Sequence, residues 1–128
     1  KRLTDLPGTS FTVQISHDPS KASKFWDPKT AYHGTSLTQI DGILREGLRP
    51  GPNITQKKVG VYCERPERIG HCLSYATFSR DPNGRNPLLM WAALFELIVE
   101  VKASPNKQWV ADQDKVIITA MTLVSFNL

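Results

Sequence analysis

A short segment, Tyr32-His33-Gly34-Thr35-Ser36, holds the residues best suited to chemistry. Gly34 has no side chain, so a flat carboxamide can approach its backbone and exchange two hydrogen bonds with it. Beside it, the imidazole of His33 offers one nitrogen donor and one nitrogen acceptor. A His-Gly turn before a helix is often only structural, so the segment is a candidate binding site that depends on further motifs.

This segment lies between a predicted strand and a predicted helix, which would hold it in place. Residues 30–33 are typical of a short strand that runs into a turn at Gly34. Ser36-Leu37-Thr38-Gln39 matches the capping-box pattern of a helix start. Apolar residues then recur at helical spacing until Gly47, a residue suited to the left-handed conformation that ends a helix. We expect this helix over residues 36–46.

The rest of the chain predicts an α+β fold with a mostly antiparallel sheet. Segment 16–29 is typical of a surface loop. A second helix is expected to start near Pro66, with a buried stripe made of Ile69, Cys72, Leu73 and Ala76. Alternating or β-rich apolar segments indicate strands at 11–15, 60–63, 95–101, 108–110 and 116–126. The last of these is apolar on both faces, as expected for a central strand.

Length, composition and charge limit which kind of protein this chain can be and which partners it favours. The 128 residues make one domain, and 40% hydrophobic with 22% charged residues is normal for a folded soluble domain. No stretch approaches the roughly 20 apolar residues of a membrane helix, so no membrane partner is expected. The net charge of +4 favours an anionic partner such as a nucleotide, RNA or an acidic protein surface. Because the chain begins at Lys1 without a methionine, we expect it to be part of a larger polypeptide.

The two cysteines, Cys63 and Cys72, are too few for a four-ligand zinc site or a disulfide framework. They are expected to be reduced and half-buried. This predicts an intracellular, reducing compartment, cytoplasm or nucleus, and no metal.

Two further stretches complete a known pattern: Ile43-Leu44-Arg45-Glu46-Gly47-Leu48-Arg49-Pro50 ends the predicted helix, and Gly60-Val61-Tyr62 follows a loop. With the His-Gly segment, this order resembles the NAD⁺ site of poly- and mono-ADP-ribosyltransferases (PARP-like, His-Tyr-Glu type). The resemblance covers residues 30–126. It implies an ADP-ribosyltransferase-like fold with two short helices flanking an NAD⁺ cleft. Residues 30–128 would be its core and residues 1–29 an N-terminal strand and loop of the same domain.

The resemblance also implies a role for single residues. The backbone of Gly34 would bind the nicotinamide carboxamide, and His33 would contact the adenine-side ribose. Tyr62 and Tyr75 would stack on the two faces of the nicotinamide ring, since aromatic faces favour a flat cationic ring. The residues that bind NAD⁺ would then be His33, Gly34, Thr35, Ser36, Tyr62, Cys72 and Tyr75.

Two positions depart from the family. Cys72 stands three residues before Tyr75, where relatives often carry a serine that hydrogen-bonds the carboxamide, and a thiol does this poorly. The family's catalytic triad ends in a glutamate on a late strand. Gln108 takes that position here, or Asp114 under a looser placement; we prefer Gln108 because residues 108–110 have the character of a strand.

A neutral amide in the triad His33, Tyr62 and Gln108 lowers the expected rate. Glutamine can hold a ribose hydroxyl, but it cannot take a proton or offset a developing positive charge. The loss of one such electrostatic group typically costs about 10²–10³-fold. Transfer of mono-ADP-ribose to a protein or nucleic-acid acceptor, weak NAD⁺ hydrolysis and no turnover all stay open, and poly(ADP-ribose) synthesis is the least expected.

Two other functions stay open beside the transferase. A non-catalytic module of the same fold would bind NAD⁺, ADP-ribose or a protein partner, as Gln108 and Cys72 suggest. RNA 2′-phosphotransferase has a related fold that also begins with His-Gly. That family relies on several arginines and further histidines, whose motifs the sequence lacks, so it ranks third.

Overall fold

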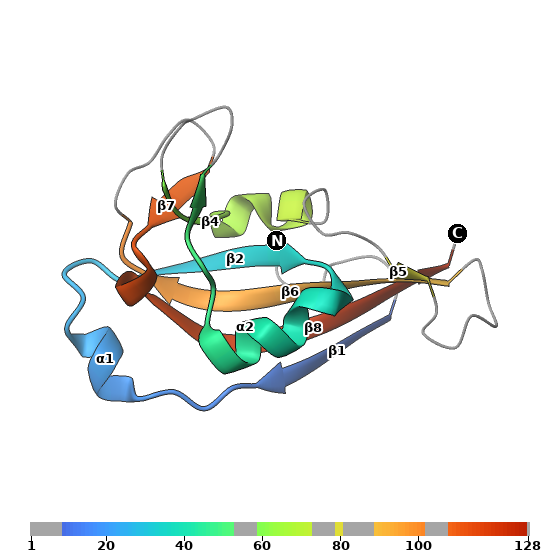
Figure 1. Cartoon of the computed structure of the whole chain (residues 1–128), viewed down its shortest axis with the longest axis horizontal. Helices are drawn as coiled ribbons and strands as arrows, with labels where there is room; N and C mark the ends of the chain where they lie inside the picture. The colour runs from blue at the N-terminus through green and yellow to red at the C-terminus, as the bar shows by residue number, and fades with distance from the viewer. Residues whose placement is uncertain (1–8, 53–58, 73–78, 81–88, 102–107, 128) are drawn as a thin grey trace.

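The computed structural model describes residues 9–52, 59–72, 79–80, 89–101 and 108–127. Its main sheet has the strand order β1-β8-β6-β2, with β5 also paired to β6, and all neighbours are antiparallel (Figure 1). The strands are β1 (Thr9–Gln14), β2 (Lys29–Thr35), β5 (Ser79–Arg80), β6 (Leu89–Val99) and β8 (Val116–Asn127). The predicted α+β class with a mostly antiparallel sheet is confirmed. So is the central place of the last strand, which lies between β1 and β6.

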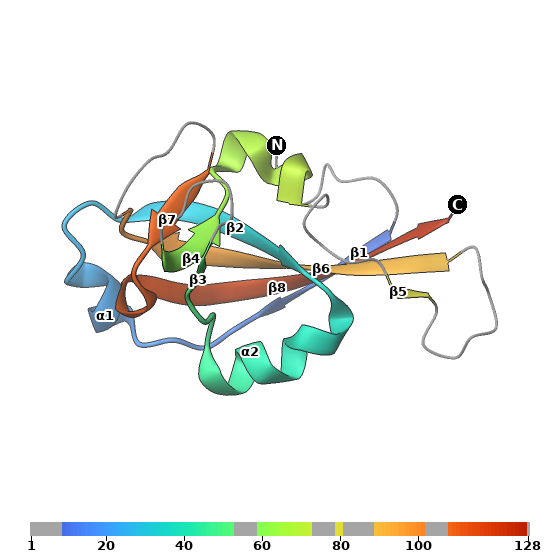
Figure 2. The same cartoon turned by 45° about the horizontal axis from the view of Figure 1, so that its top comes forward.

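A smaller sheet stands beside β2 (Figure 2). It has the order β3-β4-β7 and consists of β3 (Gly51–Pro52), β4 (Val59–Cys63) and β7 (Trp109–Ala111). One bridge joins the two sheets: Tyr32 N–H donates to the Glu64 carbonyl at 2.9 Å, and Glu64 N–H donates to the Tyr32 carbonyl at 2.8 Å. The sheets are therefore linked at one point of the β2 edge and diverge beyond it.

The helices are short: α1 (Pro19–Ser23), η2 (Leu37–Gln39), α2 (Ile40–Glu46), η3 (Pro66–His71) and η4 (Gln113–Lys115), where η marks a 3₁₀ helix. The prediction of a loop over 16–29 was incomplete because it missed α1. This helix begins after Asp18, whose Oδ1 accepts from Ser20 N–H at 3.0 Å.

The helix expected over 36–46 is present as η2 followed by α2, but the capping box does not form. The Ser36 hydroxyl lies 2.9 Å from Thr38 Oγ1 and makes no bond to a helix amide. The first turn is accordingly a 3₁₀ turn. The predicted end is confirmed, since Gly47 has φ of 80°, in the left-handed region that favours glycine.

Side chains of β2 alternate between two core clusters on opposite faces of the main sheet. Ala31 belongs to the larger cluster, which the small sheet and Leu48 cover from the α2 side. Tyr32 belongs to the smaller one, which η3 covers through Ile69 and Cys72. Within the described ranges, no helix has the length and apolar character needed to cross a membrane.

Candidate functional site

The backbone of Gly34 points toward the outer edge of β2. Tyr32 uses its N–H and C=O to bond Glu64, so these groups face away from β6. Backbone groups of an antiparallel strand alternate in direction, and residues two apart point to the same side. The N–H and C=O of Gly34 therefore also face outward. The chain leaves this edge after Glu64 and enters η3, so β4 does not pair with Gly34.

Cys72 closes in on Gly34 from the end of η3. A Cβ at position 34 would lie 2.2 Å from the Cys72 carbonyl oxygen, so only glycine fits there. The Gly34 N–H donates to the Cys72 sulfur. Burial raises the pKa of this thiol to about 12, so it is neutral at pH 7. Neutral sulfur is a weak acceptor, and both Gly34 and Cys72 are buried.

His33 is fixed by the neighbouring strand. Its Nδ1 lies 2.9 Å from the backbone carbonyl oxygen of Tyr62. Burial lowers the pKa of His33, and the bond to this carbonyl opposes the shift only in part. The ring is therefore neutral at pH 7. Because a carbonyl oxygen can only accept, Nδ1 carries the hydrogen and Nε2 is left as an acceptor.

Tyr62 and Gln108 lie on the same face of the small sheet. Tyr62 pairs with Val110, and Gln108 comes two residues before Val110, immediately before β7. Positions related in this diagonal way are about 7–8 Å apart on one face. Gln108 is buried and Tyr62 half-buried. Tyr62 and Gln108, two of the three residues that the resemblance assigns to the triad, are thus neighbours.

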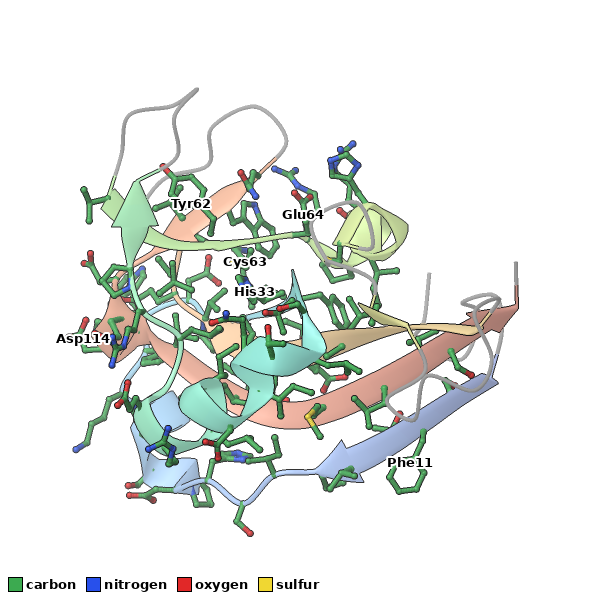
Figure 3. All side chains as sticks on the ribbon, turned by 45° about the vertical axis from the view of Figure 1, so that its right-hand side comes forward. Phe11, His33, Tyr62, Cys63, Glu64 and Asp114 are labelled. Carbon is green, nitrogen blue, oxygen red and sulfur yellow. The ribbon has the colours of Figure 1, made fainter. Side chains whose placement is uncertain are left out.

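The ring of Tyr62 does not face His33. Figure 3 shows Tyr62 and Glu64 on one side of β4, and Cys63 and His33 on the other. His33 meets Tyr62 through the backbone carbonyl alone. The first two triad positions are therefore joined by a hydrogen bond, with their side chains on opposite sides of this strand.

Asp114, the alternative third position, lies elsewhere. It is an exposed residue of η4 and lines a hollow of about 800 Å³ between the end of α2, the start of β8 and the segment after β1. His33, Gly34, Tyr62 and Gln108 do not line that hollow. Figure 3 shows Asp114 away from Tyr62 and His33.

The remaining predicted residues are only partly placed. Thr35 is buried at the end of β2, and Ser36 is half-buried at the start of η2. Tyr75 lies outside the described residues, so the expected pair of stacking tyrosines is represented by Tyr62 alone. In the ranges that the structure describes, no three His, Cys, Asp or Glu side chains are grouped as metal ligands.

Sequence reasoning missed Glu64. Its side chain is 2% exposed and lies on the same face of β4 as Tyr62. It follows the pair Cys63–Trp109, which places it opposite Gln108. Arg68 Nε lies 3.1 Å from Glu64 Oε2, yet burial prevails and raises the pKa of Glu64. The alternation of β4 and the four-residue spacing to Arg68 were the available signals.

A scan against models of known protein families finds no match, and a search of curated proteins finds no relative. The resemblance to ADP-ribosyltransferases therefore rests on the sequence motifs alone.

Proposed function

We propose that the chain is an ADP-ribosyltransferase-like domain that binds NAD⁺ at the Gly34 edge of β2 and transfers single ADP-ribose units to a protein or nucleic-acid acceptor. One observation carries the proposal. Gly34 directs an N–H and a C=O outward, at a place where only glycine fits and where the amide is held by a weak sulfur acceptor. A primary carboxamide, which both donates and accepts, matches this pair of backbone groups.

The residues around Gly34 support binding of the rest of the ligand. The nicotinamide carboxamide displaces the Cys72 sulfur and pairs with the Gly34 backbone. Nε2 of neutral His33 accepts a hydrogen bond from a ribose hydroxyl, because its Nδ1 is held by the Tyr62 carbonyl. The resemblance implies Tyr62 and Tyr75 as the two aromatic faces for stacking on the nicotinamide ring. In the structure the Tyr62 ring lies on the side of β4 opposite His33, so a ligand that meets both side chains would have to pass around this strand (Figure 3).

The transfer itself is a substitution at the ribose carbon that bears nicotinamide. The bond to the ring nitrogen breaks, and its electron pair leaves with nicotinamide, which becomes neutral. An acceptor oxygen or nitrogen forms the new bond, and its proton passes to solvent or to a nearby base. Gln108 can orient a hydroxyl but carries no charge. Glu64, opposite Gln108, is the only buried carboxylate in the described part of the chain and would supply negative charge on this face.

A non-catalytic NAD⁺-binding module of the same fold is the second candidate. It is favoured by the neutral Gln108 and by the engagement of Glu64 with Arg68 at 3.1 Å. A carboxylate that stays in this ion pair contributes little to a developing positive charge elsewhere. This module would be stabilised thermally by NAD⁺ without releasing nicotinamide.

Labelled NAD⁺ separates these candidates. Nicotinamide release and protein labelling are measured for the wild type, for Gln108→Glu, and for the double variant His33→Ala/Tyr62→Ala. We expect slow release by the wild type, a gain of about 10²-fold in Gln108→Glu and no release by the double variant. Gln113→Glu, the same change on exposed η4, is the matched control and should leave the rate unchanged.

Two outcomes decide against the transferase. If neither the wild type nor Gln108→Glu releases nicotinamide, and NAD⁺ stabilises the protein thermally in a saturable way, the binding module is favoured. If neither protein releases nicotinamide and NAD⁺ gives no thermal stabilisation, both candidate functions are excluded. Because Gln108→Glu places a second carboxylate beside Glu64, which raises the pKa of one of them, the rates are compared at pH 7.5 and 8.5.

A further inference from the structure

The edge strand β1 leaves one side unpaired in the described structure, where it is the terminal strand of the main sheet. Toward β8, Ile15 N–H donates to the Thr119 carbonyl at 3.0 Å, so Val13 and Phe11, at two-residue steps from Ile15, also bond β8. The backbone groups of the alternate residues Ser10, Thr12 and Gln14 therefore point outward, away from the sheet.

Nothing in the sequence of β1 protects this edge. Its residues, Thr-Ser-Phe-Thr-Val-Gln, include no charge and no proline, the usual means by which edge strands avoid pairing with other chains. Phe11 is 64% exposed and Val13 39% exposed, and both point to the same face because they are two residues apart. Figure 3 shows Phe11 projecting away from the body of the molecule.

We propose that β1 pairs antiparallel with β1 of a second copy of this chain, about a two-fold axis at Thr12. In this register Phe11 of one copy lies opposite Val13 of the other, and the same pair repeats across the axis. Phe11 and Val13 already bond β8, so they take the non-hydrogen-bonded positions of the new ladder, where facing side chains are closest. An aromatic ring facing a β-branched side chain is a favourable cross-strand pair.

The backbone and the charges of β1 fit a second copy. The outward residues match under the same symmetry: Thr12 faces Thr12 of the partner, and Ser10 faces Gln14. These pairs exchange the backbone hydrogen bonds that the free edge lacks. Because the strand is neutral, self-pairing places no like charges opposite one another. A two-fold contact of this kind uses the same surface on both copies, as isologous dimers do.

The proposed contact is small. Six residues span about 20 Å of strand. An interface of this length falls below the roughly 1,200 Å² of standard complexes, so weak association is expected, and about 0.1 mM, which corresponds to about −5.5 kcal/mol, is the dissociation constant on which the test is centred.

Sedimentation equilibrium over about 5 μM to 1 mM tests the dimer, with that range chosen to bracket the expected constant. The weight-average mass should rise with concentration from 14.3 kDa toward twice that value. A mass that stays at 14.3 kDa throughout would overturn the proposal.

A charge pair tests the register. Phe11→Lys/Val13→Lys places lysine opposite lysine in the dimer and should weaken association at least about tenfold. Phe11→Lys/Val13→Glu removes the same apolar side chains but places lysine opposite glutamate. This second variant should retain association better at low salt. Equal association of the two variants contradicts the Thr12-centred register.

Leu44, 50% exposed on α2, provides the control for another apolar surface. Leu44→Lys should leave the mass curve unchanged. A loss of association in Leu44→Lys, with the double-lysine variant still dimeric, would assign the contact to α2 and overturn the proposal. Thermal unfolding of each variant confirms that the fold is retained.

Discussion

The two edges of the main sheet differ in whether their outward backbone groups have partners. At the β2 edge, the chain's own atoms take up the outward backbone groups: Glu64 bonds Tyr32, and the Cys72 sulfur meets the Gly34 amide. At the β1 edge, a row of outward groups extends from Ser10 to Gln14 beside exposed apolar side chains. The first edge is closed by the chain's own atoms around the buried Gly34, whereas the second leaves a whole strand without a described partner.

The difference shows how local packing sets what an edge can bind. At β2, the approach of the Cys72 carbonyl requires a glycine at position 34. At β1, no described strand pairs with the outer side, and neutral side chains leave this edge open to pairing. The predictions below test these two descriptions.

The largest change in the free energy of unfolding is expected for Gly34→Ala. The new methyl group would lie 2.2 Å from the Cys72 carbonyl oxygen, so β2 or η3 must move. We expect a loss of about 3 kcal/mol in the free energy of unfolding, measured by urea denaturation. Gly42→Ala in α2 is the control: nothing lies within 4 Å of its added Cβ, so this variant should gain about 0.5–1 kcal/mol. Unchanged stability in Gly34→Ala would show that η3 does not pack against this edge.

The next largest change in stability is expected for the Glu64–Arg68 ion pair, which lies beside the β2 edge. Arg68→Ala leaves a carboxylate that is 2% exposed without this partner, and we expect it to cost about 2–3 kcal/mol in urea denaturation. The double variant Glu64→Gln/Arg68→Met should recover much of that loss. Arg45→Ala removes an exposed pair with Asp41 and should cost about 0.5 kcal/mol or less. Equal costs for the two arginine variants would contradict the burial of Glu64.

A pH effect follows from His33. Burial lowers its pKa in the folded protein, so the unfolded chain binds the proton more readily. Stability should therefore fall as the pH decreases through 6.5, the ordinary value of histidine, toward the lower folded value. Urea midpoints between pH 5 and 8 measure this slope, and His33→Gln should remove this contribution. His17→Gln, which replaces an exposed histidine, is the matched control. A slope of the opposite sign that disappears in His33→Gln would mean that the folded protein favours the imidazolium.

The smallest effect on folding is expected at the open edge. Phe11→Lys/Val13→Lys replaces exposed side chains, so the unfolding free energy of the dilute monomer should change by about 0.5 kcal/mol or less per site. The same variant should weaken association at least about tenfold at high concentration. A large loss of monomer stability would show that the β1 edge is covered within one chain.

Local sequence patterns predicted the helix end and most of the longer strands, but they missed β3, β5 and the part of β6 before Phe95. Alternation identified Phe95, Leu97 and Val99 as buried residues of β6, and Gly47 was recognised because its backbone conformation favours glycine. These features depend on neighbours in the sequence. The short helix α1 was missed because it buries no residue and so leaves no apolar periodicity.

The candidate site was less predictable because its contacts are between distant segments. The Nδ1 bond of His33 to the Tyr62 carbonyl joins β2 to β4, and the Cys72 sulfur meets Gly34 across the gap between η3 and β2. Glu64 is buried where its backbone bonds Tyr32, which is a contact between distant segments that the spacing to Arg68 alone could not locate.

Amide NMR of the labelled chain, titrated with NAD⁺ and with nicotinamide alone, tests the central claim most directly. The account predicts that the Gly34 N–H signal shifts saturably with both ligands, because the carboxamide oxygen replaces the Cys72 sulfur as its acceptor. The amides of Ser10, Thr12 and Gln14 should stay in place at low protein concentration. A Gly34 signal that does not move at saturating NAD⁺ would contradict the account.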